Sequence, residues 1–180
     1  MTDFETLEGT LAQVWQRLQR GVTDAEAPAR TPAFATSGAA GPEARMVVLR
    51  AVDPEEGTVE IHTDARTAKV AALRLDPRAA LLVWEPQDQF QIRLSLTCRL
   101  IQGDPNRWAK VPGASRYMYG ATPTPGQPIS APQKHEGSDP DSHIAIIGKI
   151  LHIDTVQLGH DLHRRALFEA PAFKGVWIGP

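Results

Sequence analysis

The chain has 180 residues, a formal net charge of −2 and one cysteine, Cys98. This length favours a single domain, 1–180, and the small net charge argues against a general nucleic-acid or membrane-surface binder. One cysteine leaves no pair for a disulfide and no cysteine-based zinc site. The acidic start lacks a signal-peptide pattern and no apolar run approaches membrane-spanning length, so we expect a cytoplasmic protein.

An amphipathic helix is the first expected element, within 1–21. Thr2 and Glu5 stand in capping-box spacing, and Gly21 is a common residue type at a helix end. The apolar residues between them recur at helical intervals: Phe4, Leu7, Leu11, Val14 and Leu18. Residues 22–43 are rich in Ala, Pro, Thr and Gly without a period, so we expect a surface connection there.

The clearest periodicity lies in 44–94. Arg45–Val52 is dense in β-branched and aliphatic residues, and Thr58–Thr63 alternates as a second strand. The intervening residues 53–57, Asp-Pro-Glu-Glu-Gly, have the composition of a turn. These three pieces together predict a β-hairpin.

A short helix and a third strand are expected next. Thr67 can cap the helix, which must end by Leu75 or Asp76 because Pro77 disfavours helical geometry before it. Arg78–Glu85 then reads as a strand. Its continuous apolar centre predicts that both of its faces are covered.

In the fourth strand, expected over 89–101, apolar and polar residues alternate without error from Phe90 to Leu100. In a closed or nearly closed antiparallel barrel its apolar residues would fill the interior, and Gln91 and Arg93 would point outward. Asp104 and Pro105 begin a second helix, which the Pro-Gly pair at 112–113 breaks into two pieces.

The rest of the chain contains a long loop and three shorter strand signals. Residues 120–141 are rich in Pro and Gly, which indicates either a ligand-facing loop or a partly disordered one. Ile144–Ile153, Arg165–Phe168 and Val176–Ile178 have strand character. The count then suits a barrel of about six strands.

The helix start after the second strand has two interpretations. Thr63, Thr67 and Lys69 surround free amides and a helix dipole that attract a phosphate, and Arg45 lies near the level of Thr63 in the hairpin. Alternatively, Thr67 is simply a cap and Lys69 a solvated lysine. Arg45 and Arg50 have opposite parity, so a bulge or a strand end is needed to place both on one face.

Histidines near the C-terminus raise the question of a metal. His152, His160 and His163 have no cysteine partner and no HExxH pattern, so imidazoles exposed to solvent or substrate are favoured over a metal site. The sequence also lacks Walker, GxGxxG and GxSxG patterns.

Five short motifs, RMVVLR, HT, TAK, DPRAALLVW and QFQIRL, together resemble the pyridoxamine 5'-phosphate oxidase family of FMN-binding split barrels over residues 45–101. The loop PTPGQP and the ending with HRR and GVWIGP are similar to short bacterial members with largely unassigned substrates. This resemblance implies a six-stranded antiparallel split β-barrel with flanking α-helices. It also implies non-covalent FMN and a homodimer with the flavin at the subunit interface.

The resemblance further implies which residues hold the cofactor. Arg45, Thr63 and Lys69 match family residues at the FMN phosphate and ribityl chain, whereas Gln91 and Gln127 match glutamines near the flavin. The full expected set is Arg45, Met46, Val47, Val48, Leu49, Arg50, His62, Thr63, Thr67, Lys69, Gln91, Gln127 and Arg165.

The family frame Arg-x-His-x-Arg falls on residues 161–165. His163 becomes the candidate for substrate contact and Arg165 the candidate for stabilising reduced-flavin charge. Asp161 replaces the substrate arginine and would repel a phosphorylated substrate, and Ala68 replaces an arginine beside the helix-start lysine. We therefore expect an FMN-dependent oxidoreductase acting on a small molecule. The alternatives are a pyridoxamine or pyridoxine 5'-phosphate oxidase, and a flavin- or heme-binding module without turnover.

Overall fold

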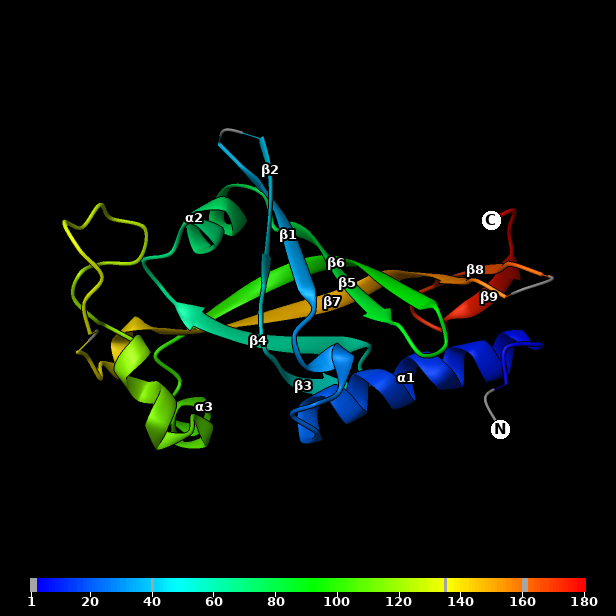
Figure 1. Cartoon of the computed structure of the whole chain (residues 1–180), viewed down its shortest axis with the longest axis horizontal. Coiled ribbons are helices and arrows are strands. Elements are labelled where there is room, and N and C mark those ends of the chain that lie inside the picture. Colours follow the sequence, from blue (N-terminus) through cyan, green and yellow to red (C-terminus); the bar gives the residue numbers. More distant parts are fainter. Residues whose placement is uncertain (1–2, 40, 135, 160–161) are drawn as a thin grey trace.

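The protein folds into one antiparallel sheet with flanking helices (Figure 1). The structure is a computed structural model that describes residues 3–39, 41–134, 136–159 and 162–180. These residues contain nine strands: β1 Ala33–Gly38, β2 Gly41–Met46, β3 Leu49–Asp53, β4 Thr58–Asp64, β5 Arg78–Glu85, β6 Phe90–Gln102, β7 His143–Gln157, β8 Arg164–Glu169 and β9 Lys174–Trp177. The mainly β class is confirmed, with nine strands where six were expected.

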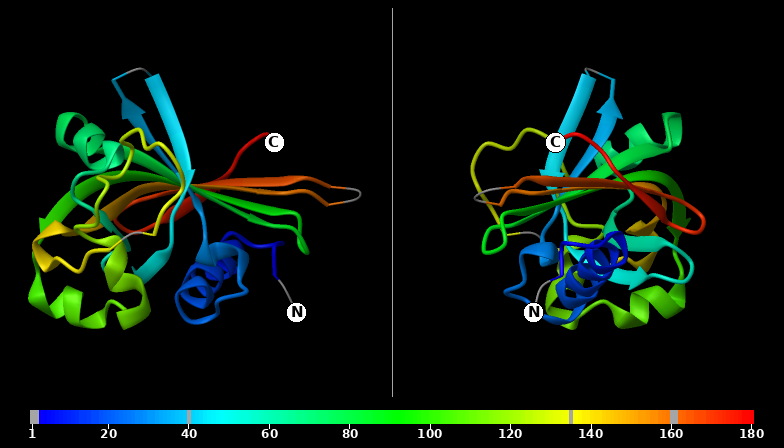
Figure 2. Two further views of the ribbon diagram at one scale, coloured as in Figure 1. Left: turned by 60° about the vertical axis from the view of Figure 1, so that its left-hand side comes forward. Right: turned by 90° about the vertical axis from the view of Figure 1, so that its right-hand side faces the viewer.

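The strands follow the order β2-β1-β5-β6-β7-β4-β3, and β8 pairs with both β7 and β9. The helices of the described ranges are α1 Leu7–Thr23, α2 Ala68–Leu75 and α3 Pro105–Lys110, with 3-10 turns η1 Pro28–Arg30, η2 Gly113–Met118 and η3 Pro140–Ser142. Figure 2 shows the β1–β2 hairpin projecting from the body, and Figure 1 shows α1 and α3 toward different ends of the sheet. Among the described helices, none has the length and apolar character needed to cross a membrane.

The first helix begins later than the sequence predicted. Thr6 is its N-cap, with Oγ1 accepting a hydrogen bond from the amide of Gly9 at 2.9 Å. The expected capping pair therefore placed the start too early, and its Thr2 lies outside the described residues. The helix also continues to Thr23, beyond Gly21, and packs the fully buried Val14 and other apolar residues against the sheet.

The segment expected as a surface connection contains a central strand. β1 pairs with β2 on one side and with β5 on the other, so that Phe34 lies between Arg45 and Leu81. The side chain of Phe34 is buried in the core, as is that of Thr36. Only two buried residues in this short strand, one of them polar, left too little apolar alternation for the sequence to reveal it.

The continuous strand expected over Arg45–Val52 is interrupted. β2 ends at Met46 and β3 begins at Leu49, and the two strands lie at opposite ends of the sheet order. Only residues 47–48 join them, so the two ends of the strand order must lie close together, as in a sheet that curls into a barrel. The β3–β4 register shifts between Leu49 and Ala51. Arg45 and Arg50 therefore do not belong to one regular strand, and strict alternation does not fix their relative directions. The β3–β4 hairpin itself is confirmed.

The third and fourth strands lie as predicted, with one correction. β5 has the expected bounds, and the alternation of β6 is confirmed because Ile92 and Leu94 are fully buried while Arg93 points outward. The prediction that both faces of β5 are covered is wrong within this chain. Leu82 is 39% exposed and Trp84 is 45% exposed, so the outer face of β5 is an apolar surface.

The two-piece second helix is also confirmed. Asp104 caps α3 by accepting hydrogen bonds from the amides of Asn106 and Arg107, and Pro112 separates α3 from η2. Within the described part of the long loop 120–141, Thr122 and Glu136 form an isolated bridge before η3 begins. The chain then enters β7, which pairs with β6, β4 and β8 and is longer at both ends than expected.

Candidate functional site

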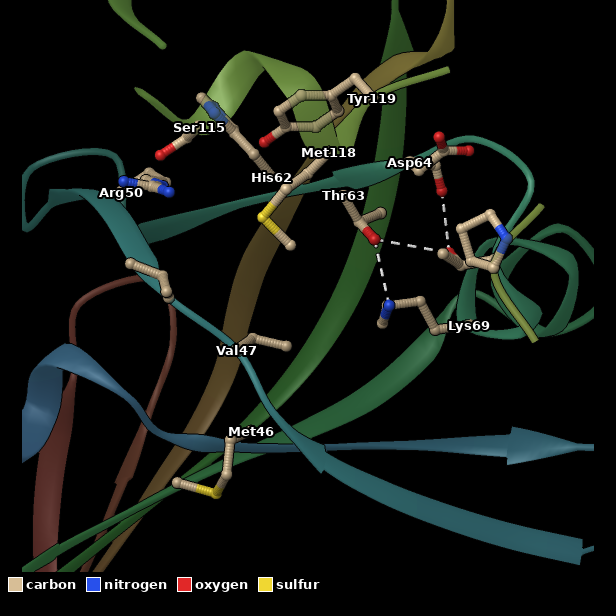
Figure 3. Close-up of a pocket in the computed structure, with 13 residues that line it drawn as sticks. Met46, Val47, Arg50, His62, Thr63, Asp64, Lys69, Ser115, Met118 and Tyr119 are labelled. Carbon is tan, nitrogen blue, oxygen red and sulfur yellow. Dashed lines mark hydrogen bonds between the residues drawn. The ribbon is translucent and has the colours of Figure 1, made fainter. Parts of the chain in front are cut away.

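A cavity of about 320 Å³ opens where three separate parts of the chain meet (Figure 3). The crossing between β2 and β3, the junction of β4 with α2, and the η2 segment with the loop after it supply its walls. Its lining residues are Met46, Val47, Val48, Arg50, His62, Thr63, Asp64, Thr67, Lys69, Ser115, Met118, Tyr119 and Pro125. Polar groups lie at two sides of the cavity, with apolar side chains between them.

One polar side is built at the start of α2. Lys69 Nζ donates a hydrogen bond to Thr63 Oγ1 at 3.0 Å, and the hydroxyls of Thr63 and Thr67 lie 3.4 Å apart. Thr67 occupies the N-cap position, but its hydroxyl donates to the backbone oxygen of Asp64 and does not cap the helix amides. A cation, two hydroxyls and amides without a side-chain cap therefore converge on one place.

The charge at this side is unbalanced. Burial lowers the pKa of Lys69, the nearby charge of Arg45 lowers it further, and Asp64 partly opposes both. Arg45 does not line the cavity, because its guanidinium donates to Glu43, Thr36 Oγ1 and the backbone oxygen of Phe34. A dianion bound here would stabilise the charged form of Lys69 by direct attraction.

Asp64 fixes the wall of the cavity beside Lys69. It is buried and accepts hydrogen bonds from the amide, Nε and Nη2 of Arg66, and from the amide of Gly120 at 2.8 Å. Burial alone would raise its pKa, but these hydrogen bonds hold the pKa of Asp64 below its ordinary value. Arg66 also donates to the backbone oxygen of Ala121 at 2.9 Å. The pair thus ties the β4–α2 turn to the long loop.

Gly120 meets a conformational requirement at this tie. Its φ is 72°, in the left-handed region that favours glycine. A Cβ there would lie 2.4 Å from Cβ of Asp139, too close for any side chain. A glycine at this position therefore allows the backbone conformation in which the Gly120 amide donates to Asp64, directly after the cavity-lining Tyr119.

The other polar side contains Arg50, His62, Ser115 and Tyr119 (Figure 3). Within the described residues Arg50 has no carboxylate partner, although burial lowers its pKa. Its guanidinium stays charged at neutral pH. Burial raises the pKa of Tyr119, so its phenol is neutral there. This side offers several donors and one charge that no acid of the described chain neutralises.

Eight of the thirteen expected cofactor residues line the cavity: Met46, Val47, Val48, Arg50, His62, Thr63, Thr67 and Lys69. Arg45 lies beside it and contributes charge, whereas Leu49 is fully buried in the core. Gln91, Gln127 and Arg165 do not line the cavity. The sequence spacing of Thr63, Thr67 and Lys69 had predicted the polar side of the cavity that these three residues form.

The expected C-terminal residues lie together at another place. His163 and Arg165 line a separate hollow of about 310 Å³ with Trp177. Arg165 donates to the carboxylate of the buried Asp154 at 2.9 and 3.1 Å, and Arg93 donates to the same carboxylate. Asp161, the expected departure from the family frame, lies outside the described residues.

Five lining residues had not been expected: Asp64, Ser115, Met118, Tyr119 and Pro125. Asp64 stands between Thr63 and Thr67, so its position beside the predicted helix start was the one available signal. The other four belong to residues 115–125, which follow a helix break and show no period. Nothing in their local pattern indicates that they return to the β4–α2 junction.

Comparisons with known proteins place this geometry in a family. The family profile described as "Pyridoxamine 5'-phosphate oxidase, FMN-binding domain" matches residues 12–102. A pyridoxamine 5'-phosphate oxidase-related, FMN-binding protein from Nostoc punctiforme PCC 73102 has a TM-score of 0.75 and 22% identity, covering 99% of this chain and 100% of that one. No match was found among curated protein sequences.

Two further solved structures are similar. PhzG from Burkholderia lata 383, in complex with tetrahydrophenazine-1-carboxylic acid, has a TM-score of 0.69 and 16% identity, covering 97% of this chain and 90% of that one. An F420 reductase has a TM-score of 0.51 and 12% identity, with 77% and 93% covered.

These likenesses establish the fold as a split β-barrel with flanking helices. The family profile spans just over half of the 180 residues and includes every described cavity residue up to Lys69. Relatives of this fold include oxidoreductases by name. The chain belongs to the pyridoxamine 5'-phosphate oxidase FMN-binding domain family.

Proposed function

We propose that this protein binds FMN non-covalently and uses it as an oxidoreductase acting on a small molecule. The observation that carries the proposal is the side of the cavity where Lys69 Nζ, Thr63 Oγ1 and Thr67 Oγ1 converge at the start of α2. A phosphate ester binds where several donors and positive charge meet, and this arrangement supplies both. Family membership supports the assignment of the phosphate to a flavin.

The other lining residues fit the rest of an FMN molecule. Met46, Val47 and Met118 form apolar walls suited to a flat ring system, and Arg50 offers a charge across the cavity from Lys69. Arg45 adds long-range attraction for the phosphate while it stays paired with Glu43. When bound, the flavin supplies hydride or electron transfer, and the protein binds it and orients the substrate.

We propose that the working form is a homodimer. Gln91 and Arg165 do not line this cavity. They lie on one sheet face, because Trp84 pairs with Gln91, Gln91 with Val156, and Val156 with Arg165. Leu82 and Trp84 make the same face apolar and exposed. Such a face marks an association surface, and the polar residues on it are then available to a second copy's flavin.

The cavity volume supports the same reading. About 320 Å³ lies near the lower limit of the roughly 300–1,000 Å³ typical of ligand pockets. We infer that residues of a second copy complete the enclosure of the flavin and its substrate. Arg165 would act from the partner, with its charge partly balanced by Asp154, and His163 beside it is the candidate for substrate contact.

A direct test combines flavin binding with reduction. Apo protein is titrated with FMN while flavin fluorescence and oligomeric state are measured, and the loaded protein is then mixed anaerobically with NADH, NADPH and a substrate panel. The panel includes pyridoxamine 5'-phosphate and tetrahydrophenazine-1-carboxylic acid, the compound bound in the structurally similar PhzG. Saturable FMN binding and flavin bleaching by at least one compound are expected. A protein that leaves FMN fluorescence unchanged contradicts the proposal.

A further inference from the structure

A cavity-lining imidazole, that of His62, is hydrogen-bonded to a carboxylate outside the cavity lining, that of Glu60. Glu60 and His62 are two residues apart on β4, so their side chains share one face of the strand. Glu60 Oε1 and His62 Nε2 lie 2.7 Å apart. The other carboxylate oxygen accepts from Arg107 Nε at 3.3 Å, and Arg107 is itself held by Asp104. The carboxylate is therefore fixed from both sides.

Glu60 is the ionised member of the pair. Burial opposes ionisation of Glu60, but the hydrogen bond from His62 and the charge of Arg107 hold the pKa of Glu60 below its ordinary value. An ionised carboxylate only accepts hydrogen bonds, so the hydrogen of this contact belongs to His62 Nε2. In the neutral ring the lone pair is then on Nδ1.

The Nδ1 atom of His62 is the ring nitrogen that Glu60 does not use. His62 lines the cavity, and no group in the described parts of the chain hydrogen-bonds to its Nδ1. Behind it, the buried ring of His143 packs edge-on at 4.6 Å between centroids, and Tyr119 packs on His143. Burial, and next the proximity of His62, lower the pKa of His143 to about 4, so this neighbour is neutral. The charged neighbours Arg107 and Asp104 therefore lie on the Glu60 side of the pair, and the ring of His143 adds no charge beside His62.

We propose that His62 exchanges a proton at Nδ1 with the molecule bound in the cavity, and that Glu60 is its positioning residue. In the forward direction an X–H bond of the bound molecule breaks, its proton joins the Nδ1 lone pair, and the electron pair stays on X. The carboxylate of Glu60 balances the imidazolium that forms. The assignment of X–H to a substrate rests on the proposed flavin function. The claim that Glu60 leaves the lone pair of His62 on Nδ1 does not depend on that function.

Long-range ¹H–¹⁵N NMR spectra of the ¹⁵N-histidine-labelled apo protein test the pair. His62 is expected as the Nε2–H tautomer in the wild type and in Glu60→Gln, whose amide oxygen still accepts the hydrogen bond. Glu60→Leu should convert it to a mixture of tautomers. Glu169→Leu is the matched control, because Glu169 lies 4.0 Å from His152 in an exposed pair. An Nδ1–H tautomer in the wild type, or no difference between wild type and Glu60→Leu, overturns the inference.

The same spectra with saturating FMN test the direction of the ring. Bound FMN is expected to shift the His62 Nδ1 resonance more than the Nε2 resonance. Unchanged Nδ1 in a protein that binds FMN by fluorescence contradicts the presentation of this nitrogen. Failure to bind FMN at all sinks the proposed function instead, and the apo tautomer still decides whether Glu60 orients His62.

Discussion

Lys69 Nζ and Thr63 Oγ1 lie 3.0 Å apart, so a helix-start lysine and a strand-end threonine point at the same place. The two residues are six positions apart in the chain, on α2 and β4. The lysine is half-buried and close to Arg45, and both effects disfavour its charged form when no anion is bound. This relationship leads to the first two predictions.

Replacing Lys69 by Met should weaken FMN binding. A hydrogen bond to a charged group contributes about 1.5–3 kcal/mol, which corresponds to a roughly 10- to 150-fold higher Kd. Fluorescence titration measures the change. Arg74→Met is the matched control, since Arg74 is a cation in the last turn of the same helix and lies outside the cavity. Equal losses in both variants would show that general helix charge, and not the Lys69 site, attracts the cofactor.

FMN affinity should fall at alkaline pH because of Lys69. Its pKa in the free protein is below the ordinary value of 10.5, and a bound phosphate raises it again. Above the free-protein pKa, binding must therefore take up a proton, and each further pH unit weakens it. Below that pKa the lysine is already charged and this dependence disappears. Lys69→Met should lack the alkaline limb in the same titration, and a limb retained in that variant assigns the dependence to another group.

Loss of the Asp64 carboxylate should loosen the long loop and destabilise the fold. Asp64→Asn breaks the buried pairing with Arg66 and weakens the bond from Gly120, at a cost of about 1–3 kcal/mol in urea unfolding at neutral pH. The folded-state pKa of Asp64 is lowered, so its stabilisation is present above the unfolded pKa and disappears as pH falls through the folded one. The difference between variant and wild type should therefore shrink in acid.

Asp76→Asn provides the surface comparison for that experiment. Asp76 makes the same contact with a residue two positions later, Arg78, but Arg78 is highly exposed. Exposed pairs contribute little, so this variant should unfold near the wild-type urea concentration. Limited proteolysis of the loop should also rise in Asp64→Asn alone. Equal unfolding free energies of the two variants would mean that the hydrogen bonds of Asp64 to Arg66 and Gly120 do not stabilise the fold.

The parts of the fold that the sequence predicted are those whose pattern is local. β6 alternates from Phe90 to Leu100, and the β3–β4 hairpin and α2 have turn or helix-end residues where they stop. β1 escaped detection because its place depends on pairing with β5, not on its own alternation. The break after Met46 likewise depends on partners far along the chain, because β2 pairs with β1 and β3 pairs with β4.

The residues of the candidate site also fall into a group that local sequence spacing indicates and a group that it does not. Thr63, Thr67 and Lys69 lie within one turn and helix start, so sequence spacing was enough to group them. Ser115 and Tyr119 line the cavity, and Asp64 and Arg66 hold the residues that follow them through hydrogen bonds to Gly120 and Ala121. That tie joins segments more than fifty positions apart and leaves no periodic trace in the chain.

Phe34 tests the structural role of the strand that the sequence did not reveal. Phe34→Ala should cost about 3–5 kcal/mol of unfolding free energy, because its ring is buried between the partners of β1 and the core. Leu75→Ala, at a residue 82% exposed, should change stability by less than about 0.5 kcal/mol. Urea unfolding measures both. A small effect at Phe34 would contradict the central position of β1.

Trp84 tests the proposed association through the outer sheet face. Trp84→Glu places a charge on the exposed apolar surface beside Gln91, and burying that charge against a second copy costs several kcal/mol. Light scattering after size exclusion should show a dimer for the wild type and a monomer for the variant. The monomeric variant should also bind FMN more weakly than the dimeric wild type, since Gln91 and Arg165 lie outside the cavity of their own chain. Leu75→Glu, on an exposed residue of α2, should stay dimeric. A wild type that binds FMN fully as a monomer would remove the need for a partner's residues.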